Sequence, residues 1–131
     1  MSVRAPHLPH RSPFVLLDRV VEVTGARGVF TKVVSAGDPC VLPSGTMPAV
    51  FLIEVLAQAG GAYLNAGEGG QAGMLAKVDG FRVLAPVRVG DELRVEVELQ
   101  RRVRAASLFR GRLLVGDEVR AEGAFTLALP T

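Results

Sequence analysis

The fold is decided by residues 47–61, which read MPAVFLIEVLAQAGG. Apart from Glu54 and Gln58, every residue in this stretch is apolar, glycine or proline. Pro48 suits the first position of a helix, where its missing N–H is not needed. The stretch therefore predicts a helix that begins at about residue 47, is apolar nearly all round and is buried. It ends at the glycine pair 60–61 or, if the apolar pattern continues, after Leu64.

Glu54 interrupts this apolar run, and a leucine at that position would serve a purely structural helix better. Burying an ionised carboxylate costs several kcal/mol unless it is paired or hydrogen-bonded. We therefore predict that Glu54 is a functional residue, although a structural carboxylate bonded to a partner such as a backbone N–H is the alternative. Gln58 lies one turn later on the same face, where it either holds Glu54 or lines the same pocket.

The rest of the chain predicts strands around this helix. Residues 19–24 and 29–35 flank a glycine-containing loop, which is typical of a hairpin. Later strands are predicted at residues 74–78, 81–87, 93–99, 107–115 and 119–129, the last three as an antiparallel meander. An antiparallel sheet wrapped around one helix is an α+β fold, and we expect a single domain over residues 1–131. Such a sheet leaves strand edges uncovered, so pairing with a second copy is predicted.

Composition narrows the function. The chain is 49% hydrophobic and 21% charged, which indicates a folded protein. A net charge of +2 and only 5% aromatic residues give little support for nucleic-acid binding. One cysteine suits a reducing cytoplasm, and neither a signal peptide nor an apolar run of about 18 residues is apparent. We expect a cytoplasmic protein with no membrane span, no metal and no cofactor.

Three segments together resemble the β-hydroxyacyl-acyl-carrier-protein dehydratases of fatty acid synthesis. They are LPHRSPFVLLDRV at residues 8–20, the helix stretch 47–60, and PVRVGDEL at residues 86–93. The resemblance implies a hotdog fold, an antiparallel sheet wrapped around one long helix, and a dimer that joins two sheets. It also implies that an acyl chain lies in a tunnel at the dimer interface.

Two residues do the chemistry in that family, and the resemblance assigns one of them. A helix glutamate from one subunit, here Glu54, works with a histidine from the loop before the helix of the other subunit. The family loop reads roughly His-Phe-Pro-Gly, whereas residues 39–46 read PCVLPSGT. The histidine position falls on Cys40 when counted without a gap, and on Val41 when aligned on the proline.

Other residues are weaker candidates for the site. Cys40 is a nucleophile, a stand-in for histidine, or a small buried apolar side chain. His7 and His10 either reach the pocket or make local hydrogen bonds, and His10 belongs to the opening Pro-His-Arg motif, which does not hold the family's catalytic histidine. The candidate site-lining residues are Cys40, Val41, Gln58 and His10.

Arginines gather in two neighbouring predicted strands. Charge complementarity favours docking of an acidic carrier protein or of a pantetheine phosphate, and a solvated outer sheet face is the alternative. The docking candidates are Arg101, Arg102 and Arg104.

Three functions follow. The first is dehydration of a 3-hydroxyacyl thioester carried by acyl carrier protein or coenzyme A, with this chain as homodimer, higher oligomer, or heterodimer partner of a histidine-bearing hotdog subunit. The second is a hotdog thioesterase, in which Glu54 activates water or attacks the thioester itself. The third is a non-catalytic acyl-binding subunit.

Overall fold

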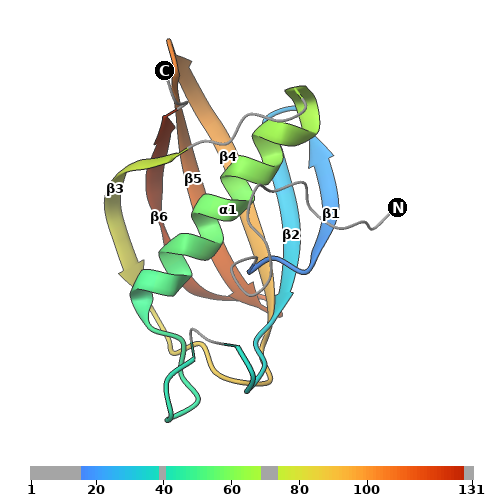
Figure 1. Ribbon diagram of the computed structural model, residues 1–131, viewed down its shortest axis with the longest axis vertical. Helices are drawn as coiled ribbons and strands as arrows, with labels where there is room; N and C mark the ends of the chain where they lie inside the picture. Colours follow the sequence, from blue (N-terminus) through green and yellow to red (C-terminus); the bar gives the residue numbers. More distant parts are fainter. Residues whose placement is uncertain (1–15, 39–40, 69–73, 129–131) are drawn as a thin grey trace.

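The computed structural model describes residues 16–38, 41–68 and 74–128. They form one six-stranded antiparallel sheet in the order β1-β2-β4-β5-β6-β3, with a single helix lying across it (Figure 1). The predicted α+β hotdog architecture is confirmed. The elements are β1 (Arg19–Thr24), β2 (Arg27–Val33), α1 (Ala49–Glu68), β3 (Met74–Val83), β4 (Glu92–Val103), β5 (Ala106–Val115) and β6 (Glu118–Ala128).

The helix differs from its sequence prediction at both ends. Pro48 lies just before the first helical residue, where its carbonyl accepts hydrogen bonds from the backbone N–H groups of Phe51 and Leu52. The glycine pair does not end the helix, which continues to Glu68. A Cβ on Gly60 would lie 2.9 Å from a ring carbon of Phe125. Gly60 is therefore a packing residue that lets α1 approach the sheet closely.

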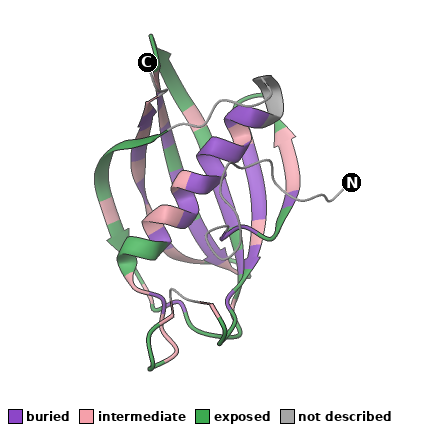
Figure 2. Ribbon diagram, viewed as in Figure 1, coloured by how far each residue is buried: buried purple, intermediate pink, exposed green. Residues whose placement is uncertain are grey.

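The helix is buried on one side, not all round. Leu52, Val55 and Leu56 are fully buried against the sheet. Val50 is 64% exposed and Phe51 37% exposed, so the first turns of α1 keep an open apolar side (Figure 2). The prediction of a buried helix was wrong for this end. Among the described residues, no helix is long and apolar enough to cross a membrane.

The strands follow their predicted pairing, with one correction. The β1–β2 hairpin and the β4–β5–β6 meander are present. The two strands predicted at residues 74–78 and 81–87 form one strand, β3, which ends at Val83 and whose pairing with β6 is irregular at two points. The prediction was wrong for residues 84–87, which lie in the loop after β3. Gly80 has a φ of +63°, which lets the chain bend within the strand instead of ending it.

The loop before β4 fixes the start of the helix. The N–H of Met47 donates to the carbonyl of Val87 at 2.9 Å, and the N–H of Val34 at the end of β2 donates to the carbonyl of Asp91 at 2.9 Å. Arg120 on β6 forms an ion pair with Asp91 at 3.2 Å. The helix start, β2 and β6 are thus tied together through this one loop.

Candidate active site

Glu54 lies in the second turn of α1, where its side chain is half-buried. The amide Nε2 of Gln58 donates a hydrogen bond to Glu54 Oε1 at 3.3 Å. Gln58 is itself buried, and its Oε1 accepts a hydrogen bond from the backbone N–H of Leu16 at 2.7 Å. A neutral amide, anchored to the chain that enters β1, therefore orients the Glu54 carboxylate.

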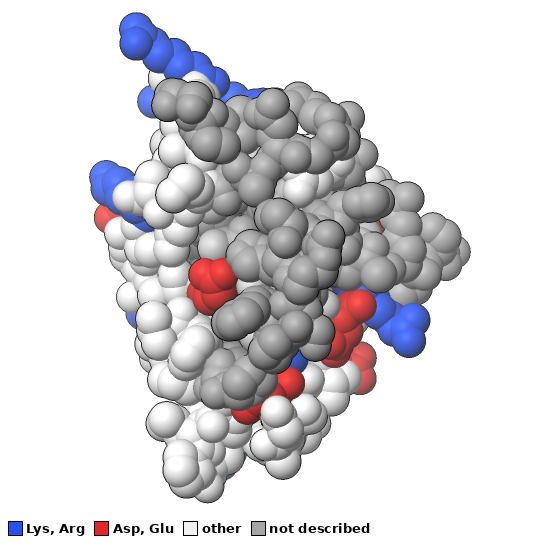
Figure 3. All heavy atoms as spheres, viewed as in Figure 1, with Lys and Arg blue, Asp and Glu red and all other residues white. Residues whose placement is uncertain are grey.

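Apart from Gln58, the helix residues about one turn from Glu54 are apolar. Val50, one turn earlier, is exposed, and Ala57, nearly one turn later, is half-buried. On the face of the molecule that carries α1, most described atoms belong to uncharged residues, and basic side chains stand out toward the rim (Figure 3). A carboxylate in this position can give a proton to a bound group or take one from it.

The other predicted site residues divide into two groups. Cys40 and His10 lie outside the described residues, as does His7. Val41 is half-buried, packs against the core and donates its N–H to the carbonyl of Asp38 at 3.2 Å. The structure thus brings Gln58 to Glu54 and places Val41 in the loop before the helix.

A buried ion pair anchors that loop. Lys32 is 3% exposed, and its Nζ lies 3.0 Å from Asp38 Oδ2, which also accepts the N–H of Ser35. Burial opposes ionisation of Asp38, but the hydrogen bond from Ser35 and the charge of Lys32 hold the pKa of this carboxyl below its usual value. Sequence reasoning missed this pair, although the alternation along β2 places Lys32 on the inner face with Phe30.

The docking candidates Arg101, Arg102 and Arg104 lie together at the turn between β4 and β5, and all three side chains are exposed. Arg104 has a φ of +57°, a conformation that favours glycine. The turn thus projects a basic tip from the end of the sheet.

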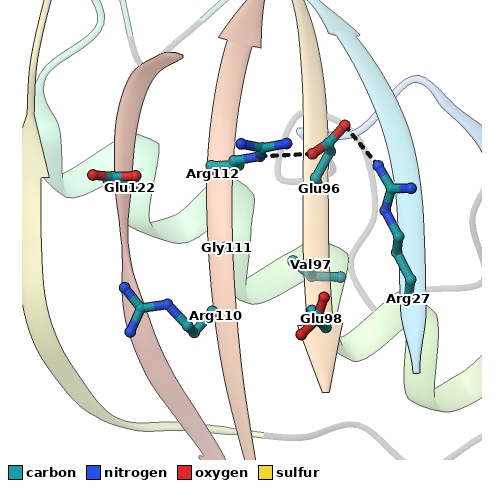
Figure 4. Close-up of a pocket in the computed structure, with 8 residues that line it drawn as sticks. All are labelled: Arg27, Glu96, Val97, Glu98, Arg110, Gly111, Arg112 and Glu122. Carbon is teal, nitrogen blue, oxygen red and sulfur yellow. Dashed lines mark hydrogen bonds and ion pairs between the residues drawn. The ribbon is translucent and has the colours of Figure 1, made fainter. Parts of the chain in front are cut away.

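The outer face of the sheet carries a second charged region. A hollow of about 440 Å³ there is lined by charged side chains of four strands (Figure 4). Glu96 is 7% exposed and is held by three arginines from three strands. The nitrogen-to-oxygen distances are 2.9 Å for Arg27, 2.6 Å for Arg94 and 2.7 Å for Arg112.

The electrostatics of Glu96 are those of a structural ion pair. Burial opposes its ionisation, but hydrogen bonds from Arg112 and Arg94, together with the charges of Arg112 and Arg27, hold its pKa below the usual value. Arg112 is thus committed to Glu96.

The described part of the chain contains no candidate metal site. There, no group of three or more histidine, cysteine, aspartate or glutamate side chains lies close enough to hold a metal ion.

Comparison with known proteins identifies the family. A family model described as ApeP-like, ApeP dehydratase, matches residues 4–131. The chain belongs to the ApeP-like dehydratases. It is also 40% identical over 129 residues to the 3-hydroxyacyl-[acyl-carrier-protein] dehydratase FabZ of Symbiobacterium thermophilum, a match covering 93% of this chain and 91% of the relative. FabZ of Chloroflexus aggregans is 40% identical as well, with 93% and 90% covered.

Solved structures agree with this assignment. The dehydratase heterocomplex ApeI:P from Xenorhabdus doucetiae contains a chain that matches with a TM-score of 0.86 and 26% identity, covering 95% of this chain and 88% of that one. Zebra fish thioesterase superfamily member 2 matches with a TM-score of 0.75 but only 13% identity, covering 94% and 88%, so that likeness concerns the fold alone. This ApeP-like dehydratase is accordingly a hydro-lyase acting on 3-hydroxyacyl thioesters.

Proposed function

We propose that this chain supplies one half of a 3-hydroxyacyl thioester dehydratase site and that a histidine-bearing hotdog subunit supplies the other half. The observation that carries the proposal is the placement of Glu54 on the open side of α1, oriented by Gln58. The loop before the helix offers no matching group, because residues 39–46 contain no histidine. In this proposal the acyl chain lies in a tunnel between the two subunits.

Dehydration needs two proton-handling groups. A base takes the α-proton, the electrons of the broken C–H bond form the new double bond, and the C–O bond breaks as an acid protonates the leaving hydroxyl. Glu54 assists the departing hydroxyl, which leaves as water. The histidine of the second subunit takes the α-proton, because an imidazole both accepts and returns protons near neutral pH.

The comparison with Xenorhabdus doucetiae supports a second, different subunit. That relative was solved as a heterocomplex of a dehydratase, and the sequence of the present chain accounts for one group of the catalytic pair. Because the site is divided between subunits in this proposal, a chain that carries only the glutamate completes a catalytic site with a histidine-bearing subunit.

The carrier in this proposal is acyl carrier protein, which the names of the curated relatives specify for those enzymes. The basic tip formed by Arg101, Arg102 and Arg104 is exposed at one end of the sheet and complements an acidic carrier. Replacing Arg101 and Arg104 together with glutamine should weaken carrier binding and reduce its salt dependence. Arg19→Gln, at an exposed position on β1, is the matched control. Equal binding by both variants would place the docking surface elsewhere.

The test of the half-site is a spectrophotometric enoyl-thioester assay. The chain alone should dehydrate 3-hydroxyacyl-carrier substrates about 10²–10⁴-fold more slowly than the same chain mixed with a histidine-bearing hotdog subunit. Cys40→His or Val41→His should raise the activity of the chain alone, according to which side chain faces the substrate. Fast dehydration by the unmodified chain alone would refute the half-site. Thiol release without enoyl formation would identify a thioesterase instead, and binding without turnover in any mixture would identify an acyl-binding subunit.

A further inference from the structure

The hollow on the outer face of the sheet lies on the opposite side of the strands from α1, as Figure 4 shows. Two rows of side chains border it, and the strand register places the members of each row side by side. The first row is Arg27, Glu98 and Arg110, and the second is Glu96, Arg112 and Glu122. The backbone of Val97 and Gly111, which are register partners, forms the floor between the rows, because the side chain of Val97 points into the core.

Two of the arginines that line the hollow have unused hydrogen-bond donors. Arg112 holds Glu96 through its Nε at 2.7 Å, and Arg27 holds the same carboxylate through one terminal nitrogen at 2.9 Å. Within the described residues, neither arginine makes a further hydrogen bond or ion pair. A guanidinium carries five N–H donors, and these two side chains are 50% and 43% exposed. Most of their donors therefore remain available to a bound molecule.

Arg110, the third arginine of the lining, has no carboxylate partner among the residues that the structure describes. Its register neighbours are Glu98 on β4 and Ala124 on β6. Ala124 has no charge, and Glu98 accepts a hydrogen bond from Gln100 at 2.7 Å. In Figure 4 the guanidinium of Arg110 points toward β6 and away from Glu98. An exposed cation at the border of the hollow thus keeps all its donors open.

The charges around the hollow leave it positive. Glu96 is also held by Arg94 at 2.6 Å, and Glu122 is held by Arg82 at 2.6 Å. Arg94 and Arg82 do not line the hollow, so they neutralise these two carboxylates from outside it. Glu98 is the third carboxylate of the lining and stands against three lining arginines. An excess of two positive charges therefore remains at the hollow.

A dianion with several acceptor oxygens complements this arrangement. A phosphate monoester carries a charge of about −1.5 to −2 at pH 7 and has three acceptor oxygens, and guanidinium groups bind phosphate oxygens in pairs. The arginines approach from β2 on one side of the floor and from β5 on the other (Figure 4). Donors that converge from two sides suit a tetrahedral anion better than a planar carboxylate. The volume of about 440 Å³ is that of a small-molecule site, so it also has room for an organic group.

We propose that this hollow binds a small phosphate monoester, with Arg27, Arg110 and Arg112 donating to the phosphate oxygens. Glu96 does not touch the ligand in this arrangement, but it holds two of the three arginines in place. The site is on the face of the sheet opposite α1, which carries Glu54. Binding there requires neither dehydration nor a second subunit, so the inference is independent of the half-site.

Two carboxylates of the lining favour a particular organic group. Ionised Glu98 and Glu122 only accept hydrogen bonds, so they favour an ester that carries hydroxyl or amino groups beside its phosphate. Glycerol 3-phosphate has both a phosphate monoester and hydroxyl groups, and it is the probe for the experiments.

The first experiment measures the dissociation constant of glycerol 3-phosphate by isothermal titration calorimetry. Arg110→Gln should weaken binding by about tenfold or more, because a charge-assisted pair of hydrogen bonds is lost. Arg110→Lys keeps the charge but loses the planar fork, so its affinity should lie between the two. Glu98→Gln removes a negative charge and should tighten binding. Arg19→Gln, at an exposed position on β1 outside the hollow, is the matched control and should bind as the parent chain does.

The fold of Arg110→Gln is checked by circular dichroism. Arg110 makes no ion pair within the described residues, so this variant should keep the parent spectrum and the parent stability in urea. A loss of affinity in a folded variant then reports on the site itself.

The second experiment defines the class of ligand. Inorganic phosphate should bind more weakly than glycerol 3-phosphate, because it lacks the hydroxyl groups that face the carboxylates. Succinate, a dianion without a phosphate, should bind at least about tenfold more weakly than glycerol 3-phosphate, and glycerol should not bind. Co-sedimentation with phosphatidic acid vesicles separates a lipid headgroup from a free ester. Binding to either source that depends on Arg110 supports the phosphate site.

Three results would overturn the proposal. They are an absence of binding to the parent chain at millimolar glycerol 3-phosphate, equal affinity in the parent chain and Arg110→Gln, and succinate binding as tight as that of the ester. These readouts use the chain alone and no thioester, so failure of this site and failure of the half-site are told apart.

Discussion

Two glutamates in this chain occupy opposite sides of the molecule and differ in their burial and in the groups that hold them. Glu96 lies on the outer face of the sheet, nearly buried, with three guanidinium groups within 2.9 Å. Glu54 lies on the helix at the other side, half-buried, and is oriented by the neutral amide of Gln58. The first carboxylate is held by three cationic groups, whereas the second accepts a hydrogen bond from a neutral amide. Burial alone therefore does not mark a site, but the chemistry of the partners does.

The largest expected effect comes from Glu54→Gln. Turnover by the complete site, measured with the histidine-bearing subunit, should fall about 10²–10⁴-fold because one of the two general catalysts is lost. The fold should persist, since the amide has the same shape and the same contact to Gln58. Circular dichroism and urea denaturation check the fold. Full activity in this variant would mean that the carboxylate is structural.

Glu96→Gln should show the reverse pattern. The free energy of unfolding should fall by about 1–3 kcal/mol, because three arginines lose the charge they share. Turnover should change little, since Glu96 lies on the outer face. Urea denaturation measures the loss. Glu98→Gln, two residues away on the same strand and exposed, is the control and should stay within about 0.5 kcal/mol of the parent chain. Equal stability of Glu96→Gln would show that the arginines hold the strands without this carboxylate.

Gln58→Met keeps the length of the side chain but removes its hydrogen bonds to Glu54 and to the backbone of Leu16. The backbone N–H of Leu16 is then left without this acceptor in a buried position, which should cost about 1–2 kcal/mol of stability. Turnover should fall roughly tenfold, because Glu54 loses its orienting group. Gln58→Glu would keep an acceptor for Leu16 and so separates the two effects. Unchanged turnover in Gln58→Met would limit Gln58 to a structural role.

The smallest expected effect concerns the stability of the fold at acid pH. The pKa of Glu96 is lower in the folded chain than in the unfolded one, so the unfolded chain binds more protons as the pH falls through about 4.3. The stabilisation from Glu96 is therefore complete above that pH and is lost as the pH falls further toward the folded pKa. Glu96→Gln should flatten the pH dependence of unfolding below about pH 4.3. An identical slope in both chains would assign acid sensitivity to other groups, such as Asp38.

The fold was largely predictable, and the errors have local causes. The apolar run after Pro48 located the start of α1 to within about two residues. Its end was misplaced because Gly60 serves close packing against Phe125, and a sequence does not distinguish this use of glycine from a helix stop. The break predicted within β3 is an irregularity at Gly80, since a strand paired on one side tolerates a bend.

The candidate site was predictable only where a residue conflicted with its surroundings. Glu54 was found because a charge in an apolar helix demands an explanation. Glu96 was not, because a charged residue on an alternating strand is expected to face outward, and its partners come from separate strands that only the sheet register brings together. Lys32 was missed for a related reason, since its partner Asp38 lies in a loop without a regular pattern.

The loop before β4 also has a consequence for synthesis of the chain. Met47 at the helix start is bonded to Val87, and the loop that holds Val87 is clamped by Arg120, close to the carboxyl end of the described residues. An isolated helix with two adjacent glycines is marginal in water, so α1 depends on these later contacts. During translation, Glu54 therefore reaches its final position only after β6 has left the ribosome. A chain that stalls before Arg120 lacks the contacts of this residue with the loop before β4, so its apolar helix stays exposed. Proteases should remove such a chain before it competes with the complete chain for a partner subunit.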